Sequence, residues 1–185
     1  MRAFIAIELE DDVKQYLEEV QKKTEELCRK GNYTPRENFH LTLHFLGEIT
    51  PEDVEYLRQA VMETTKFQRA FDLTLDRIGF FPRGREGVLW AGVEKSGELL
   101  RLFQSLEKNL GKQGFAREKK GLSPHITLGR EVEPFHGFAD VQKKIEVEKK
   151  TVRVTGISLM ESVRIGRKLV YRPLFRQKLR VAKTD

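Results

Sequence analysis

Cysteine is almost absent from this sequence, which holds one thiol, Cys28, in 185 residues. A single thiol excludes an intramolecular disulfide and any metal site built from several thiolates. We expect Cys28 to lie in an amphipathic helix and to serve packing only. Folds stabilised by internal disulfides are therefore excluded, and redox chemistry is not expected.

Long apolar runs are also missing. No run approaches the ~20 residues that a helix needs to span a bilayer, and the N-terminal segment MRAFIAIELEDD reaches acidic residues too early for a signal peptide. We therefore expect a cytoplasmic protein that makes no membrane contact. Hydrophobic residues make up 39% of the chain, which is enough for one globular domain.

An excess of one charge sign is present but small. Lys and Arg number 34 against 28 Asp and Glu, which gives a formal net charge of +6. A basic balance suits a polyanionic partner, whereas a dense mixture of both signs is also typical of ion-paired surfaces in heat-stable proteins. The net charge therefore fits either a polyanionic partner or an ion-paired surface.

Apolar periodicity predicts the same order of elements twice along the chain. Strands are expected at 2–8, 39–47, 71–78, 88–93, 122–129, 151–160 and 168–179, and helices at 11–31, 50–61, 96–111 and 138–148. The repeated β-α-β-α-β order predicts an α+β fold with two pseudo-symmetric lobes and a central cleft. We expect one bilobal domain over 1–185, with pseudo-repeats at about 1–80 and 86–180.

Histidine is scarce, since the chain has only four, and two of them occupy matching patterns. In FHLTLHFLG, period-two geometry places His40, Thr42 and His44 on one face of a strand. In SPHITLG, the same geometry places His125 and Thr127 together. One His-x-Thr pattern is a weak signal, but two copies at equivalent positions of a repeated unit predict a paired active site.

Such a pair suits the opening of a cyclic phosphodiester by water. One group must take a proton from the attacking water, and another must protonate the departing oxygen. Histidine can do either near neutral pH because its unperturbed pKa is about 6.5. Threonine hydroxyls can donate hydrogen bonds to the nonbridging phosphate oxygens.

The two patterns resemble the paired HxTx signatures of the two-histidine (2H) phosphoesterase superfamily. Within it, the chain is most similar to the RNA 2',3'-cyclic phosphodiesterase family, which was first known as the 2'-5' RNA ligases. The similar segments are FHLTLHFLGE, GFFP followed by VLWAGV, SPHITLGR, and LMES before Tyr171. The resemblance implies a bilobal α+β fold with the active cleft between its lobes.

The resemblance also implies an activity and site roles. The activity is metal-independent hydrolysis of 2',3'-cyclic phosphate ends of RNA or nucleotides to 2'-phosphomonoesters. His40 would be the proton donor and His125 the proton acceptor, with Thr42 and Thr127 binding phosphate. The near symmetry of the motifs leaves open which histidine is acid and which is base.

The expected partner is RNA with 2',3'-cyclic phosphate ends, tRNA halves included, and we expect a monomer without cofactor or metal. Three alternatives stay open: a 2'-5' RNA ligase that joins tRNA halves, a non-catalytic module that binds RNA ends, and a zinc hydrolase using His40 and His44. The last is disfavoured because residues four apart on a strand lie roughly 13 Å apart.

Other residues near the motifs are candidates for substrate contact. Arg130 directly follows the second motif, where a guanidinium could hold phosphate. His44 is expected at the rim of the cleft, either in substrate contact or as an ordinary surface residue. Phe80, Phe81 and Trp90 could stack a base, although aromatic residues on strands more often pack in a core.

Overall fold

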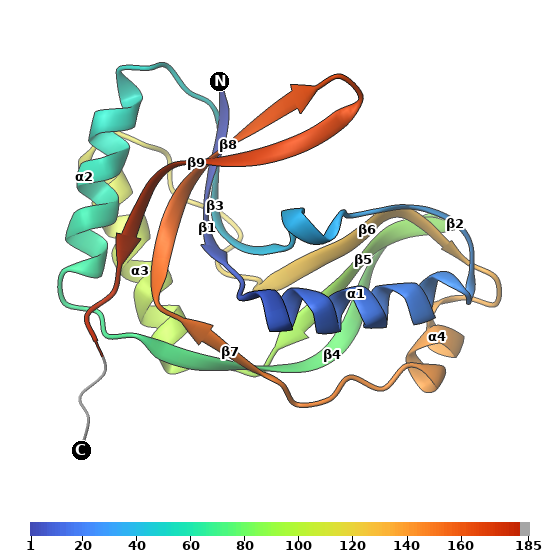
Figure 1. Cartoon of the computed structure of the whole chain (residues 1–185). Helices are drawn as coiled ribbons and strands as arrows, with labels where there is room; N and C mark the ends of the chain where they lie inside the picture. The colour runs from blue at the N-terminus through green and yellow to red at the C-terminus, as the bar shows by residue number, and fades with distance from the viewer. Residues whose placement is uncertain (182–185) are drawn as a thin grey trace.

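A strongly curled antiparallel sheet forms the centre of the computed structural model, which describes residues 1–181 (Figure 1). Within these residues the sheet has nine strands, with the order β7-β4-β5-β6-β3-β1-β8-β9 and with β2 paired to β6. The strands are β1 (Arg2–Glu8), β2 (Cys28–Tyr33), β3 (His40–Glu48), β4 (Phe71–Arg83), β5 (Glu86–Val93), β6 (His125–Pro134), β7 (Thr151–Val154), β8 (Gly156–Ile165) and β9 (Lys168–Lys178).

The helices form two groups, one for each half of the sheet (Figure 1). They are α1 (Asp11–Glu25), α2 (Asp53–Thr65), α3 (Gly97–Lys112) and α4 (Phe138–Lys144), with a short 3-10 turn, η1, at Arg36–Asn38. α2 packs against α3 and against β8 and β9, whereas α1 packs against β2 and β6 and α4 against β4. Each helix within residues 1–181 is too short or too polar to cross a bilayer.

The α+β class and the repeated order of elements are confirmed. The order β1, α1, β3, α2, β4 is followed by β5, α3, β6, α4 and then β7 and β8. The halves of the sheet, however, are not the halves of the sequence, because β4 pairs with β5 while β8 pairs with β1. The two units thus exchange their outer strands, and the boundaries of the pseudo-repeats stay a prediction.

Two helix starts follow the signals in the sequence. The Thr50 hydroxyl accepts a hydrogen bond from the backbone N–H of Asp53 at 3.3 Å, and the Asp53 carboxylate accepts one from the N–H of Thr50 at 2.8 Å. The Ser96 hydroxyl accepts from the N–H of Leu99 at 3.1 Å. The Thr50 and Ser96 hydroxyls thus satisfy N–H groups that the first helical turn leaves without intrahelical partners.

Two predicted boundaries are wrong, and strand pairing explains both. α1 ends at Glu25 and Cys28 begins β2, because 28–33 pairs with β6 instead of continuing the helix. The predicted strand over 151–160 is divided at Thr155, since β7 pairs with β4 in one half of the sheet and β8 pairs with β1 in the other. Local sequence does not encode these distant partners.

Helices cover one face of the sheet, and the other face is more open. The main hydrophobic core lies between one face and the helices, and it includes Ile5, Leu41 and Ile126, each of which is at most 1% exposed. On the other face, Phe4, Ala6 and Met160 form a small separate cluster with Tyr171 packed against it. The motif-bearing strands β3 and β6 lie at the centre of this second, more open face.

The β4–β5 hairpin places the only tryptophan of the chain on the open face. Gly79 pairs with Trp90 across the hairpin, and the indole ring covers the glycine so closely that an added Cβ would lie 2.0 Å from its Cζ2 atom. Glycine is therefore required at this position for Trp90 to lie flat against β4.

We predict that Gly79→Ala will displace the indole and destabilise the protein by about 1–3 kcal/mol, because overpacking forces neighbouring groups to move. Urea unfolding measures the stability, and the emission spectrum of Trp90 reports the displacement. Gly97→Ala is the control, since its Cβ would meet only the flexible end of Arg101, at 3.3 Å. An unchanged spectrum and unfolding midpoint in Gly79→Ala would contradict the prediction.

Candidate active site

The two His-x-Thr motifs lie on neighbouring antiparallel strands at the centre of the sheet. Leu41 of β3 pairs with Ile126 of β6, and both point into the core. In an antiparallel pair, the residues on either side then face each other in opposite order. His40 therefore lies beside Thr127, and Thr42 lies beside His125, all on the open face. The structure brings these four predicted residues together.

Both imidazole rings are fixed in the same way. Nδ1 of His40 lies 2.8 Å from the carbonyl oxygen of Asn38, and Nδ1 of His125 lies 2.7 Å from that of Ser123. A carbonyl oxygen can only accept, so Nδ1 carries the hydrogen in each ring. Each Nε2 is then available to accept or to carry the proton used in catalysis.

His40 has a largely apolar environment. Its ring stacks on Phe4 with the centroids 4.7 Å apart, and Tyr171 meets it edge-on at 5.1 Å. Burial lowers the pKa of His40 to about 4, because the charged imidazolium loses hydration, while the contact with the Asn38 carbonyl opposes this shift. In the neutral ring, Nε2 accepts the hydroxyl of Thr42 at 2.9 Å.

His125 is surrounded by a second group of aromatic side chains. Phe81 meets it edge-on at 5.2 Å and Trp90 at 6.2 Å, whereas Phe80 points elsewhere and stacks on Phe138. The guanidinium of Arg77 lies over the Trp90 ring, 5.5 Å from its centroid. Aromatic groups thus support both histidines, one from each half of the sheet.

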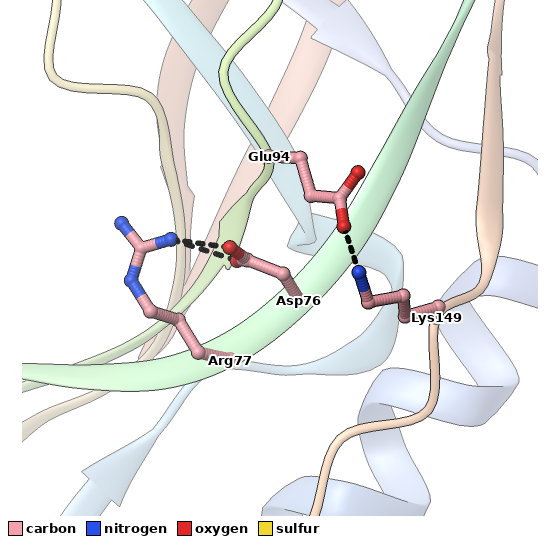
Figure 2. Close-up of polar contacts among 4 residues, drawn as sticks. All are labelled: Asp76, Arg77, Glu94 and Lys149. Atoms are coloured by element: carbon pink, nitrogen blue, oxygen red, sulfur yellow. Dashed lines mark hydrogen bonds and ion pairs between the residues drawn. The ribbon is translucent and has the colours of Figure 1, made fainter.

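Figure 2 shows two ion pairs, one within β4 and one between the end of β5 and the segment before β7. Nη1 of Arg77 contacts both carboxylate oxygens of Asp76, at 2.8 and 2.7 Å, and Lys149 contacts the carboxylate of Glu94. The first pair holds Arg77 at the position where it can cover Trp90. The second joins the end of β5 to the segment before β7.

The motifs open into a cleft of about 670 Å³. Arginine is its only charged residue type apart from the two histidines, and none of its described lining residues is Asp or Glu. The lining consists of Arg2, Ala3, Phe4, Thr34, Asn38, His40, Thr42, Phe45, Gly47, His125, Thr127, Arg130, Ser162, Arg164, Leu169 and Tyr171. Arg130 therefore lies on the cleft wall, and its contact with substrate stays a prediction. Such a lining suits an anion.

His44 is not at the cleft rim, and the prediction of substrate contact is wrong. Register shifts in the β1–β3 pairing leave Leu43 without a partner, so that Leu43 and His44 both turn toward the core. His44 is 5% exposed, and its Nδ1 lies 2.5 Å from the carboxylate of Glu107 in α3. His40 and His44 consequently lie on opposite faces and cannot share a metal ion.

Two buried amide side chains hold the motifs in place, and sequence patterns did not identify either. Nδ2 of Asn38 donates to the carbonyl of Leu169 at 2.8 Å, which ties the segment that orients His40 to β9. Nε2 of Gln21 donates to the carbonyls of Thr34 and Leu128 at 2.8 and 2.7 Å, which ties α1 to the second motif. A lone amide in a helix or loop gives no local signal of such a role.

Known proteins with a similar chain are phosphodiesterases and ligases of RNA. A family model described as the 2'-5' RNA ligase superfamily matches residues 8–165. An RNA 2',3'-cyclic phosphodiesterase from Archaeoglobus fulgidus is 31% identical over 94% of this chain and 98% of its own. One from Thermotoga maritima is 34% identical over 70% of each chain. E. coli LigT complexed with 3'-AMP has a TM-score of 0.75 at 26% identity, covering 96% of this chain and 97% of its own.

We predict that His40 stays neutral in the free protein until the pH falls to about 4, because burial lowers its pKa. Inorganic phosphate in the cleft should raise that pKa, since an anion favours the imidazolium. Titration of the imidazole nitrogens by NMR, assigned with His40→Asn, measures both values. A free-protein pKa near 6.5, or no change on adding phosphate relative to equal ionic strength of chloride, would refute the prediction.

We predict that His44→Ala will lower the free energy of unfolding by about 3 kcal/mol, because it leaves the Glu107 carboxylate buried without this partner. Urea unfolding measures this loss. His136→Ala is the control, since His136 is exposed and should change stability little. Unchanged stability together with weakened substrate binding in His44→Ala would instead restore His44 to the substrate site.

Proposed function

This chain belongs to the 2'-5' RNA ligase superfamily, and from that premise we propose that it is an RNA 2',3'-cyclic phosphodiesterase. The substrate is RNA with a 2',3'-cyclic phosphate end, of which a tRNA half is one kind, and the product is a 2'-phosphomonoester. The proposed reaction needs no metal or cofactor. We propose that the protein acts as a monomer.

The reaction exchanges one phosphorus–oxygen bond for another. Nε2 of His125 takes a proton from water as the water oxygen bonds to phosphorus. The bond from phosphorus to the 3' oxygen breaks, and that oxygen takes the proton carried by Nε2 of His40. The hydroxyls of Thr42 and Thr127 donate to the nonbridging oxygens, where negative charge accumulates in the transition state.

The observation that carries this proposal is the head-to-tail arrangement of the two motifs. The antiparallel pairing of β3 and β6 places one histidine at each end of a rectangle of four side chains, with a threonine beside each. A phosphate bound between them therefore meets a proton acceptor on one side and a proton donor on the other. This is the geometry that displacement at phosphorus requires of an acid and a base.

The environment of His40 has two consequences for its role. The bound substrate anion favours the imidazolium over the neutral ring that His40 has in the free protein, so His40 can take a proton from solvent and deliver it to the departing alkoxide. The low pKa of His40 keeps the free imidazole neutral, which favours a second assignment with His40 as base and His125 as acid. The two assignments can be distinguished with a substrate whose leaving group needs no proton.

We predict that His40→Ala and His125→Ala each lower kcat for a nucleoside 2',3'-cyclic phosphate by about 10²–10⁴, the range for loss of a general acid or base. Assays in the presence of a chelator, with 2' and 3' products resolved by chromatography, measure the rate and the regiochemistry. His136→Ala is the matched control and should keep the wild-type rate. A 3' product, or full activity in either active-site variant, would contradict the proposed mechanism.

The acid is identified with a substrate in which sulfur replaces the bridging 3' oxygen. A thiolate leaves without needing a proton, so this substrate should restore much of the rate of the variant that lacks the acid. We expect rescue of His40→Ala and none of His125→Ala. The reverse pattern would establish the second assignment.

A further inference from the structure

The cleft continues beyond the two histidines along β1 and β8, toward the ends of these strands. We call this extension the arginine arm and define it by the lining residues that lie there: Arg2, Phe45, Ser162, Arg164 and Leu169. The reaction proposed above uses none of them. The cleft is therefore larger than the hydrolysis of a cyclic phosphate alone requires, and the arm is the additional part.

Strand register places the two arginines of the arm on the same face. Arg2 of β1 pairs with Ser162 of β8, and Ser162 pairs with Tyr171 of β9. Arg164 follows Ser162 by two residues, so both side chains leave β8 on the face that carries Arg2. Two guanidinium groups thus border one stretch of the open face, close enough to bind one anion together.

The positive charge of the arm is not neutralised by the protein. Within residues 1–181, neither Arg2 nor Arg164 takes part in an ion pair. The carboxylate of Glu48, whose backbone pairs with Arg2, is 3.4 Å from the N-terminal ammonium. Arg2 and Arg130 both lower the pKa of the Tyr171 hydroxyl, against the larger opposite effect of burial. The arm is thus a cationic surface in the same cleft as the two motifs.

The arm begins at some distance from the motifs along β1. Thr42 pairs with Ala6, and Arg2 lies four residues further along β1. Four residues of strand cover roughly 13 Å between Cα atoms. The cleft is therefore long enough to hold one phosphate at Thr42 and a second phosphate at Arg2.

Apolar surface accompanies the charge, as a nucleotide chain would require. Phe45 is 60% exposed at the cleft and Leu169 is 37% exposed on the facing hairpin. The phenyl ring of Phe45 also packs at a tilt on Phe4, with the centroids 6.2 Å apart, which supports the ring from below. Exposed aromatic rings beside arginines are typical of sites that bind single-stranded nucleic acid.

We propose that the arginine arm is a second phosphate subsite, an inference that rests on the proposed function. Through Arg2 and Arg164 the arm binds the phosphate attached to the 5' oxygen of the terminal nucleoside. The preferred substrate is then an RNA chain and not a free cyclic mononucleotide. A base of that chain stacks on Phe45. The arm thus distinguishes an RNA end from smaller molecules that contain the same cyclic phosphate.

The test compares three substrates that differ only on the 5' side: adenosine 2',3'-cyclic phosphate, its 5'-phosphorylated form, and a dinucleotide ending in the same group. For the wild type, kcat/KM should rise with the 5' phosphate and stay high for the dinucleotide. Arg2→Ala and Arg164→Ala should each reduce this gain about tenfold, the effect of losing one charged contact. For the dinucleotide, each variant should also reduce the slope of log KM against log salt by roughly 0.7.

Arg101→Ala is the matched control, because it removes one exposed arginine from α3, outside the cleft. It should show the same gain as the wild type. An equal gain in all variants overturns the subsite. A gain with the 5' phosphate that the dinucleotide does not share overturns the preference for RNA chains and assigns the arm to mononucleotides.

Failure of the proposed function gives a different result, namely no hydrolysis of any of the three compounds by the wild type. Calorimetric binding of the same compounds then decides the subsite by itself. Tighter binding of the 5'-phosphorylated compounds, lost in Arg2→Ala and Arg164→Ala, supports it. Equal affinity for all three compounds overturns it.

Discussion

The candidate active site depends on one antiparallel contact between β3 and β6 at the centre of the sheet. The pairing of Leu41 with Ile126 buries one side of each motif, and this forces the histidines and threonines onto the opposite face. A one-residue slip in either strand would reverse the two faces and bury these four side chains. Hydrophobic burial therefore enforces the register on which the position of the imidazole nitrogens depends.

Much of this arrangement could be predicted from the sequence, because the motifs combine two local signals. Alternation of apolar and polar residues predicts the strands and their faces, and the repeat of His-x-Thr predicts that two such faces act together. The chain order of elements, the helix starts at Thr50 and Ser96, and the meeting of His40 with His125 all follow from information within short segments.

What could not be predicted depends on partners far away in the chain. His44 looked equivalent to His40 because strict alternation was assumed, and only the β1–β3 register shifts turn it to the core beside Glu107. The charged segment 28–33 forms the strand β2 because its backbone pairs with β6. In the sequence, Arg2 and Arg164 look like ordinary surface charges. Arg2 pairs with Ser162, two residues before Arg164, and this pairing places both arginines on one face. Each of these features depends on strand pairing across the whole sheet.

The exchange of outer strands has a consequence for how the protein is made. β1 lies beside β3, the strand that carries His40, and its other neighbour, β8, comes only from 156–165, with β9 later still. A nascent chain that has left the ribosome only as far as the second motif has both histidines but lacks the strand beside β1. Contacts of such high sequence separation form late and slowly. The part of the sheet beside β1 is therefore completed only when 156–178 can pair there, well after both motifs have been made.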